Sequence, residues 1–326
     1  MFSIVIPVYN TERYIARCLE SCVNQSFGDI EIIVVDDCGS DQAMQVAQEY
    51  AQKDRRIRIV KNPKNLGTFH SRILGSEDAN GEYILFVDSD DFIELKTCEK
   101  IKEALESEQC KSGSRADICW FAFKRLFSKK EELFKPYGGV SLGYEVLRNN
   151  MFQWEVCGKA YKRELVQRAN EVIAERMKEE RKLLFGEDVI KSFAINLLAG
   201  KCIGIDEVLY LYCDNPTSIT KDRNNPQTAL RNSEQLGFVI EFLKRFDTLK
   251  EAKANPYYAE VKQRLQKILG EHQKMWEYQA FIANRFKRGW FVYPRVYLES
   301  LGLKKDYRRV VVRVSVYFLT AGLVKI

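Results

Sequence analysis

The sequence predicts an α/β fold with a mostly parallel sheet flanked by helices. Four short apolar runs, at 3–8, 30–35, 57–60 and 83–87, have the length and composition of strands that are buried on both faces. The segments between them show helical spacing of apolar residues, and this alternation of strand and helix is typical of parallel sheets. Ligands in such sheets bind at the carboxyl ends of the strands, so we expect the functional residues there.

The other elements are predicted in chain order from their local patterns. In the first part of the chain, helices are expected at 12–25, 41–53, 67–79 and 94–107, and a further strand at 116–123. The less regular middle is predicted to contain helices at 143–150, 161–180 and 187–199 and a short strand at 207–212. Beyond about 228 the pattern is helical, with 3–4 spacing at Val261, Leu265, Ile268, Leu269, His272 and Trp276. We therefore expect one α/β domain over 1–225, with halves at 1–123 and 124–225, and a helical C-terminal region over 226–326.

The composition fits a reduced, cytoplasmic, globular protein. The 326 residues are 46% hydrophobic and 12% aromatic, which is enough to fill a substantial core. The nine cysteines are scattered without a CxxC pair, and there are two histidines, which argues against a disulfide framework or a zinc site. No stretch reaches the ~20 uncharged residues of a spanning helix. The first predicted strand begins at the N-terminus, so we expect no signal peptide.

A cluster of carboxylates follows the fourth predicted strand. The run YILFV at 83–87 stops at Asp88, Asp90 and Asp91, whose mutual repulsion makes joint ionisation costly unless a positive charge is near. Mg²⁺ is often held by one or two carboxylates together with substrate phosphates, and Mn²⁺ accepts similar oxygen ligands. The cluster therefore indicates a metal ion that carries a diphosphate. The alternative is a solvated turn, since Asp-Ser-Asp-Asp is also good turn chemistry.

Seven segments in chain order resemble the motifs of one known family. They are IVIPVYN at 4–10, EIIVVDDCGSD at 31–41, NLGTFHSRILG at 65–75, FVDSDD at 86–91, WEVCGKAYKREL at 154–165, FGEDV at 185–189 and LYLYCDNPTSIT at 209–220. The ordered set resembles the family 2 glycosyltransferases, which have a GT-A fold, and it covers about 1–220. The third segment departs from the family pattern, with Ser71 for Ala and Ile73-Leu74 in place of Asn and one further residue. This segment and the basic tail are most similar to bacterial lipooligosaccharide β-1,3-galactosyltransferases.

The resemblance implies a UDP-sugar donor and a divalent metal cofactor, Mn²⁺ or Mg²⁺. The residues that it implies for nucleotide-sugar binding are Pro7, Tyr9, Asp36, Asp37, Asn65, Gly67, Arg72, Asp88, Ser89 and Ser218. Asp90 is expected to be the principal metal ligand, and Asp88 to contact both ribose and metal. One carboxylate of the Asp36–Asp37 pair is expected to contact the nucleotide: Asp37 can accept the N3–H of uracil, whereas Asp36 can instead cap the next turn. Arg72 suits phosphate oxygens, although a surface arginine with a packed stem is the alternative.

The resemblance also implies the catalytic base and the acceptor contacts. Inverting transfer to a hydroxyl needs a base beside the acceptor oxygen, and the FGEDV match assigns this role to Asp188. The alternative is a helix-start carboxylate, a common place for Asp. Glu187 is then an acceptor contact or a helix-start carboxylate. Trp154 and Lys159 are expected to line the acceptor pocket, although Trp154 can equally belong to the core. Ser218 is expected near the diphosphate, unless its segment is a simple turn.

The C-terminal tail is strongly basic. The whole chain has a net charge of +6, while 285–326 contain ten basic and two acidic residues. Lys305, Arg309 and Arg313 recur at every fourth position, and aromatic residues interleave with the basic ones, a pattern that suits an anionic membrane surface. We therefore expect peripheral attachment to the inner face of the cytoplasmic membrane and a lipid-linked glycan acceptor. A helix face packed on the catalytic domain and a homo-oligomer contact are the alternatives; no motif indicates a nucleic-acid partner.

Two other functions share single features with this sequence. Haloacid-dehalogenase-like phosphatases also use DxD after a strand, but they place it after the first strand rather than the fourth. A non-catalytic nucleotide-sugar-binding protein is expected to lack the metal or base residues, whereas Asp88, Asp90 and Asp188 are all present. The resemblance favours galactose as the sugar. UDP-N-acetylgalactosamine, UDP-N-acetylglucosamine and UDP-glucose stay open as donors, because small changes in a pocket alter discrimination by only ~1–3 kcal/mol.

Overall fold

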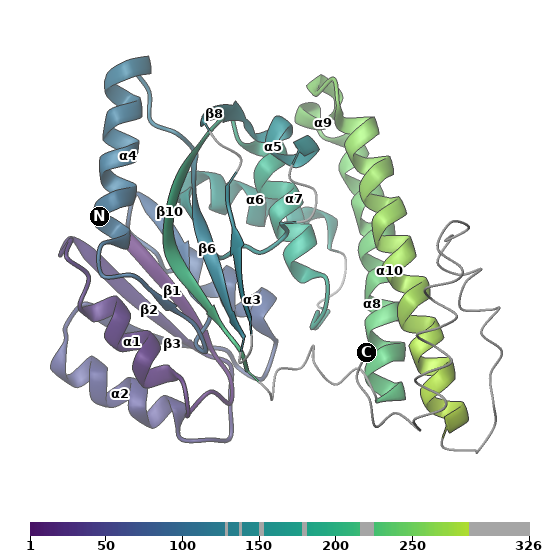
Figure 1. Cartoon of the computed structure of the whole chain (residues 1–326), viewed down its shortest axis with the longest axis horizontal. Helices are drawn as coiled ribbons and strands as arrows, with labels where there is room; N and C mark the ends of the chain where they lie inside the picture. Colours follow the sequence, from purple (N-terminus) through teal and green to yellow (C-terminus); the bar gives the residue numbers. More distant parts are fainter. Residues whose placement is uncertain (128–129, 137–138, 150–152, 178–180, 216–224, 287–326) are drawn as a thin grey trace. The chain divides into compact units, whose positions relative to one another are not determined.

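The fold is mixed α/β, with a central, mostly parallel sheet flanked by helices, as the sequence predicts (Figure 1). This computed structural model describes the whole chain except residues 128–129, 137–138, 150–152, 178–180, 216–224 and 287–326.

The first third of the chain alternates strand and helix. Its elements are β1 (Phe2–Val8), α1 (Ile15–Val23), β2 (Ile30–Asp36), α2 (Ala43–Lys53), β3 (Ile57–Lys61), α3 (Thr68–Glu77) and β4 (Tyr83–Phe86). β1 pairs in parallel with both β2 and β4, and β2 pairs in parallel with β3. Every residue of β1, β2 and β4 is buried, which explains why their sequences are so largely apolar.

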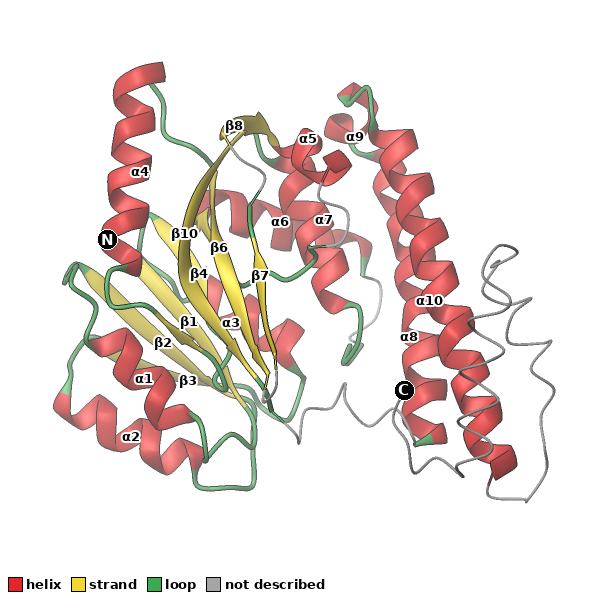
Figure 2. Ribbon diagram, viewed as in Figure 1, coloured by secondary structure: helices red, strands yellow, loops and turns green. Residues whose placement is uncertain are grey.

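Helices cover both faces of these strands. α1 and α2 lie on one face and α3 lies on the other (Figure 2). The strand order β3-β2-β1-β4 changes direction after β3, so right-handed crossovers place α3 on the opposite face. α3 approaches the sheet closely at Gly75, where a Cβ atom would lie 2.4 Å from Cγ1 of Val5 and 2.9 Å from Cγ2 of Val35. Arg72 lies one helical turn earlier, so this packing also fixes its position.

The middle of the chain extends the sheet. Its elements are β5 (Phe92–Ile93), α4 (Thr97–Ser112), β6 (Ile118–Phe127), β7 (Lys130–Phe134), β8 (Gly139–Leu142), α5 (Gly143–Asn149), β9 (Lys159–Lys162), α6 (Arg163–Arg176), α7 (Glu187–Leu198) and β10 (Lys201–Cys213). The sheet order is β3-β2-β1-β4-β9-β6-β10-β5, with β7 beside β6 and β8 beside β10. β9 runs antiparallel between β4 and β6, and β10 runs parallel to β6. β4, β6 and β10 therefore end at the same edge as β1 and β2.

The C-terminal part is helical, as predicted, over the residues that the structure describes, which end at Phe286. Its elements are α8 (Pro226–Lys244), a 3₁₀ turn (Arg245–Thr248), α9 (Lys250–Ala254) and α10 (Tyr258–Phe286). The chain forms two compact units, one of 1–217 with 242–262 and one of 218–241 with 263–326. On α10, Val261, Leu265, Leu269 and Trp276 are buried, whereas His272 is exposed and does not belong to the apolar stripe on which the sequence placed it. None of the helices in the described ranges combines the length and the apolar character needed to cross a bilayer.

The individual elements agree with the prediction to different degrees. The four strands and three crossover helices of the first third are confirmed to within a few residues at each end. The strand expected at 207–212 is the end of the longer β10. The sequence does not predict β5, β7, β8 or β9. These short strands form through pairing with distant neighbours, which their own few residues do not reveal.

Candidate active site

The carboxyl ends of the strands bring most of the predicted residues to one edge of the sheet. β1 ends just before Tyr9, β2 ends at Asp36, and β4 ends at Phe86, with one residue between it and the 88–91 cluster. Val8 of β1 and Asp36 of β2 are paired neighbours, so the first two of these ends are adjacent. This is the ligand-binding edge expected for a sheet of this type.

The centre of the site is an ion-pair network built on Arg72. The Arg72 side chain is only 3% exposed. Its Nη2 donates to Oδ1 of Asp88 at 2.7 Å, and its Nη1 donates to Oδ1 of Asp188. Both aspartates remain 30% exposed, so each can still contact a ligand. One buried guanidinium therefore joins the acidic motif after β4 and the acidic motif of α7 into a single site.

Two buried polar atoms of the 65–75 segment have no hydrogen-bond partner among the described residues. They are Nε of Arg72 and Oδ1 of Asn65. A buried donor or acceptor without a partner costs free energy, and functional sites are where such atoms are expected. Both residues are among those expected from the sequence to bind the nucleotide sugar.

Asp37 fastens the loop that precedes α3. Its Oδ1 accepts from Nδ2 of Asn62 and from the backbone N–H of Leu66, both at 2.8 Å, and its Oδ2 accepts from the backbone N–H of Gly67 at 2.9 Å. Gly67 has φ of 87°, a conformation that favours glycine. These contacts set the start of α3 and thus the direction of Arg72. Both oxygens of Asp37 are engaged with the chain itself.

Asp36 has a different environment. Its Oδ1 accepts from the backbone N–H of Cys38 at 2.8 Å, and its Oδ2 lies 3.3 Å from Nζ of Lys61. The first contact is the turn-capping arrangement that the sequence left open as an alternative. Pro7 is buried within β1, whereas Tyr9 is 40% exposed at its end. Tyr9 is therefore available for contact with a ligand.

Asp88 and Asp90 supply oxygen ligands that fit a hard divalent cation. Oδ2 of Asp90 accepts from Nδ2 of Asn215 at 2.8 Å, and its backbone oxygen accepts from Nη2 of Arg17 at 2.7 Å. In the part of the chain that the structure describes, no group of three or more His, Cys, Asp or Glu side chains is arranged to hold a metal. One or two carboxylates completed by substrate phosphates and water are a usual Mg²⁺ set, so these residues fit a metal that binds together with a diphosphate.

The first turn of α7 carries two acidic side chains. Gly186 has φ of 79° and precedes the helix, and Glu187 and Asp188 follow it. Burial raises the pKa of Asp188 above its usual value, while the charge of Arg72 opposes this rise. Burial and the charge of Asp188 together raise the pKa of Glu187 to about 8. A carboxylate with a raised pKa is a better proton acceptor near neutral pH, provided that it is ionised.

Lys159 is buried and points into the protein. Its Nζ donates to the backbone oxygen of Glu155 and to that of Cys157, the latter at 3.4 Å, and lies 4.2 Å from the ring centroid of Trp120. Burial lowers the pKa of Lys159 to about 8. Trp154, at the start of the same loop, is partly exposed. These contacts make Lys159 a support for the loop that carries Trp154.

The environments of several residues near the site were not predicted. Asn215 bonds Asp90. Asp91, which the sequence grouped with Asp88 and Asp90 in the candidate metal-binding cluster, is buried rather than open to a ligand. Lys191, one turn after Asp188 on α7, is 1% exposed, and burial lowers its pKa to about 7. Asn215 lies within the 209–220 match, which is a usable signal. Nothing in the local pattern marks Lys191, which reads as an ordinary polar position on a helix.

Of the remaining predicted residues, the structure describes Ser89 but not Ser218 or the basic tail. Ser89 is buried, and its Oγ accepts from Oγ1 of Thr11 at 3.0 Å. Ser218 and the basic tail after 286 lie outside the described residues.

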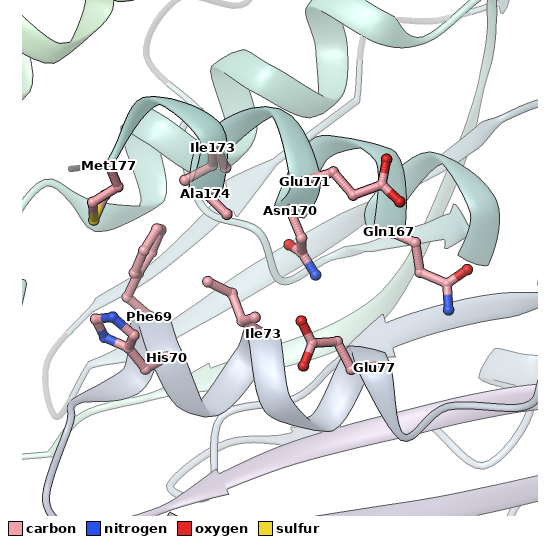
Figure 3. A pocket seen from close by; sticks show the side chains of 10 residues that line it. All are labelled: Phe69, His70, Ile73, Glu77, Gln167, Asn170, Glu171, Ile173, Ala174 and Met177. Atoms are coloured by element: carbon pink, nitrogen blue, oxygen red, sulfur yellow. The ribbon is translucent and has the colours of Figure 1, made fainter. Parts of the chain in front are cut away.

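A pocket lies between α3 and α6, and none of the predicted site residues lines it (Figure 3). Its lining residues are Phe69, His70, Ile73, Glu77, Gln167, Asn170, Glu171, Ile173, Ala174 and Met177. Side chains of the two helices face each other across it, and its lining is a mixture of apolar and amide or acidic groups. It contains none of the acidic residues of the strand-end site, so we assign the chemistry to the strand ends.

Comparison with known proteins gives a family match. The family model described as "Glycosyl transferase family 2" matches residues 3–168. EpsJ of Bacillus subtilis, named as an uncharacterized glycosyltransferase, is 32% identical over 257 residues, which are 76% of this chain and 70% of EpsJ. TarS of Staphylococcus aureus, a poly(ribitol-phosphate) β-N-acetylglucosaminyltransferase, is 38% identical over 99 residues, which are 29% of this chain and 17% of TarS.

Solved structures share the fold. The crystal structure of S. aureus TarS 1–349 in complex with UDP-GlcNAc matches with a TM-score of 0.55 at 19% identity, covering 90% of this chain and 93% of that one. The mannosyltransferase PcManGT from Pyrobaculum calidifontis, in complex with GDP-Man and Mn²⁺, matches with a TM-score of 0.52 at 17% identity, covering 98% and 86%. At this level of identity the likeness establishes the fold.

Proposed function

Because the chain belongs to glycosyl transferase family 2 and is a glycosyltransferase, we propose that it moves a sugar from a UDP-sugar to a glycan hydroxyl with inversion at the anomeric carbon. The observation that carries this proposal is the bridge of Arg72 between Asp88 and Asp188. It places the motif proposed to bind the nucleotide next to the carboxylate proposed to act on the acceptor. Donor and acceptor groups would thus meet at the carboxyl ends of the strands.

Asp188 is the proposed catalytic base. It would accept the proton of the acceptor hydroxyl while that oxygen attacks the anomeric carbon from the face opposite the diphosphate. The partial exposure of Asp188 lets an acceptor reach it, and burial, which raises its pKa, makes it a stronger base than an ordinary aspartate. Glu187, next to it, is proposed to contact the acceptor, together with Trp154.

Charge on the departing diphosphate needs stabilisation. Nε of Arg72 has no hydrogen-bond partner among the described residues, and we propose that its guanidinium contributes to this stabilisation from within the site. Asp90 and Asp88 would hold Mn²⁺ or Mg²⁺, and the bound metal supplies neutralising charge at the phosphate oxygens. In PcManGT, a protein of the same fold, the structure contains Mn²⁺ with the nucleotide sugar.

The nucleotide contacts follow the strand ends. Tyr9, Asp36 and Asp88 are proposed to face the uridine and ribose, while Gly67 and Asn65 shape the turn before Arg72. Asp37 contributes through the loop it fastens, and its bonds to that loop make Asp36 the better candidate of the pair for direct contact. Pro7 and Ser89 support the two strand ends from buried positions. Ser218 is proposed to contact the diphosphate.

The donor sugar and the acceptor are the finer parts of the proposal. Galactose is favoured by the sequence resemblance, and N-acetylglucosamine is the main alternative because TarS binds UDP-GlcNAc on the same fold. The acceptor is proposed to be a cell-surface glycan such as lipooligosaccharide, built on a lipid carrier at the inner face of the cytoplasmic membrane. The basic tail supports this placement through its charge. Residues 1–123 and 124–225 are proposed as the donor and acceptor halves of the catalytic domain.

Replacing Asp188 with Asn tests the proposed chemistry. Asn keeps an oxygen for Arg72 but removes the base, so UDP binding measured by calorimetry should be retained while kcat for transfer falls by about 10²- to 10⁴-fold. Asp78→Asn is the matched control, since Asp78 also pairs with an arginine, at 2.7 Å from Arg58, but lies at the other edge of the sheet. Transfer that survives in Asp188→Asn would place the base elsewhere.

A further inference from the structure

The third carboxylate after β4 has a role different from that of its neighbours. Asp91 is 1% exposed, whereas Asp88 keeps 30% of its side-chain surface. Oδ2 of Asp91 accepts from the hydroxyl of Tyr210 at 2.6 Å, and its Oδ1 accepts from the backbone N–H of Cys213 at 2.7 Å. Both oxygens are therefore bound to β10, and this carboxylate is directed into the protein rather than toward a ligand.

Tyr210 connects Asp91 to the backbone of Asp88. The Tyr210 hydroxyl, while donating to Asp91, accepts from the backbone N–H of Asp88 at 3.2 Å. The backbone N–H of Asp91 in turn donates to the carbonyl oxygen of Asp88 at 2.9 Å. Both peptide groups of Asp88 are thus held by the Asp91–Tyr210 pair. Tyr210 itself is 2% exposed, so its hydroxyl has little alternative in water.

The same pair ties the end of β10 to the metal-binding turn. Cys213 is the last residue of β10 and is held by Asp91, and Asn215, two residues later, donates to Oδ2 of Asp90. β9 runs antiparallel to both β4 and β6, and β10 runs parallel to β6. β4 and β10 therefore end at the same edge of the sheet. The hydrogen bonds of Asp91 and Tyr210 therefore hold the 88–91 turn against β10, the strand that leads into residues 214 and 215.

We propose that Asp91 and Tyr210 are positioning residues that set the orientation of Asp88 and join the 88–91 turn to the end of β10. The inference rests on the proposed function, because it assigns the pair a role in binding the metal and the diphosphate of the donor. Neither residue touches the donor. They act through Asp88 and Asp90, in the way that hydrogen-bonded outer groups orient the direct ligands of a metal.

The test compares Tyr210→Phe with Tyr83→Phe. Tyr83 is also 2% exposed, and its hydroxyl donates to the backbone oxygen of Ala116 at 2.6 Å, far from the 88–91 turn. Both variants lose one buried hydroxyl, and both should lower the melting temperature. Calorimetry of UDP binding with Mn²⁺ should show affinity weakened about 10- to 100-fold in Tyr210→Phe and unchanged in Tyr83→Phe. The inference would be overturned if both variants bound UDP as tightly as the wild type, or if both lost affinity to the same extent.

A second variant tests whether Asp91 acts through Tyr210. Asp91→Asn keeps an oxygen for the Cys213 N–H but replaces the acceptor of the Tyr210 hydroxyl with a donor. UDP affinity in the double variant Asp91→Asn/Tyr210→Phe should be no weaker than in the single variant that binds UDP more weakly. A double variant whose fold-loss in affinity is the product of the two single losses would overturn the claim that Asp91 acts through Tyr210. A Tyr210→Phe variant that binds UDP with Mn²⁺ as tightly as the wild type would overturn the inference and leave the proposed function standing. Wild-type protein that binds no UDP would overturn the proposed function and the inference with it.

Discussion

At the residue scale, Arg72 organises the site. Its guanidinium is buried and bonds two carboxylates that the sequence separates widely, Asp88 and Asp188. Replacing a bidentate arginine with lysine retains the charge but loses the planar fork that reaches two partners. The arrangement explains why the chain places a glycine turn and the buried Asp37 before α3: both determine where this one side chain points.

The raised pKa of Asp188 predicts the pH dependence of transfer. Burial raises this pKa above the usual aspartate value, and the base is active only when ionised, so kcat should fall as the pH is lowered through the raised pKa. Activity should therefore be lost at a higher pH than an ordinary aspartate would give. A kcat–pH profile, with circular dichroism at each pH to confirm folding, measures this. A profile that stays flat down to about pH 4, the range of an unperturbed aspartate, would contradict the assignment.

The sequence predicted candidate site residues but not the contacts that hold them. The carboxylates at 88, 90 and 188 and the arginine at 72 are visible as motif positions, and the structure brings Asp88, Asp188 and Arg72 together. The inward direction of Lys159 and the burial of Asp91 were not visible. They depend on backbone oxygens at 155 and 157 and on Tyr210, contacts set by folding rather than by local spacing.

At the element scale, the packing of α3 on the sheet is the feature that positions the site. Gly75→Ala would bring a Cβ atom within 2.4 Å of Val5 and 2.9 Å of Val35, so it should lower stability by about 1–3 kcal/mol through overpacking. Gly270→Ala on α10 is the matched control, because a Cβ there meets nothing within 4 Å. That change should stabilise by about 0.5–1 kcal/mol through helix propensity.

Thermal unfolding of the two glycine variants checks this contrast. The melting temperature should fall for Gly75→Ala and stay the same or rise for Gly270→Ala. If Gly75→Ala is as stable as the wild type, Val5 and Val35 can move aside, and α3 is held less tightly than its close approach to β1 and β2 indicates.

Elements with a strong local pattern were the predictable ones. β1, β2 and β4 are buried along their whole length, and such apolar runs can be recognised without knowledge of their neighbours. β9, with the sequence KAYK, is a strand because β4 and β6 pair with it on either side. Its four residues do not specify that outcome, and the antiparallel insertion was therefore missed.

At the scale of the whole molecule, the charge distribution predicts where the enzyme works. The segment 285–326 has ten basic and two acidic residues, so anionic lipid should attract it, by about 1 kcal/mol for each basic residue near the surface. A chain ending before Arg285 should no longer sediment with anionic vesicles at physiological salt, while the full chain should. A shortened protein that is folded by circular dichroism and still sediments would remove the tail from the membrane proposal.

The sequence as a whole contained more information on family than on substrate. Seven ordered segments were enough to indicate the glycosyltransferase family and its fold, and both are confirmed. The sugar and the acceptor depend on the detailed shape of a pocket, and a few atoms there change discrimination by only ~1–3 kcal/mol. No motif spacing encodes such a difference.

Release of UDP from four donors, with and without Mn²⁺, tests the central claim most directly. UDP-galactose, UDP-N-acetylgalactosamine, UDP-N-acetylglucosamine and UDP-glucose would each be offered with a galactose- or N-acetylgalactosamine-terminated acceptor. The account predicts release from one donor that needs the metal, increases with acceptor, and is lost in Asp90→Ala. Release that is unaffected by chelation and by Asp90→Ala, or no release and no UDP binding with any donor, would contradict it.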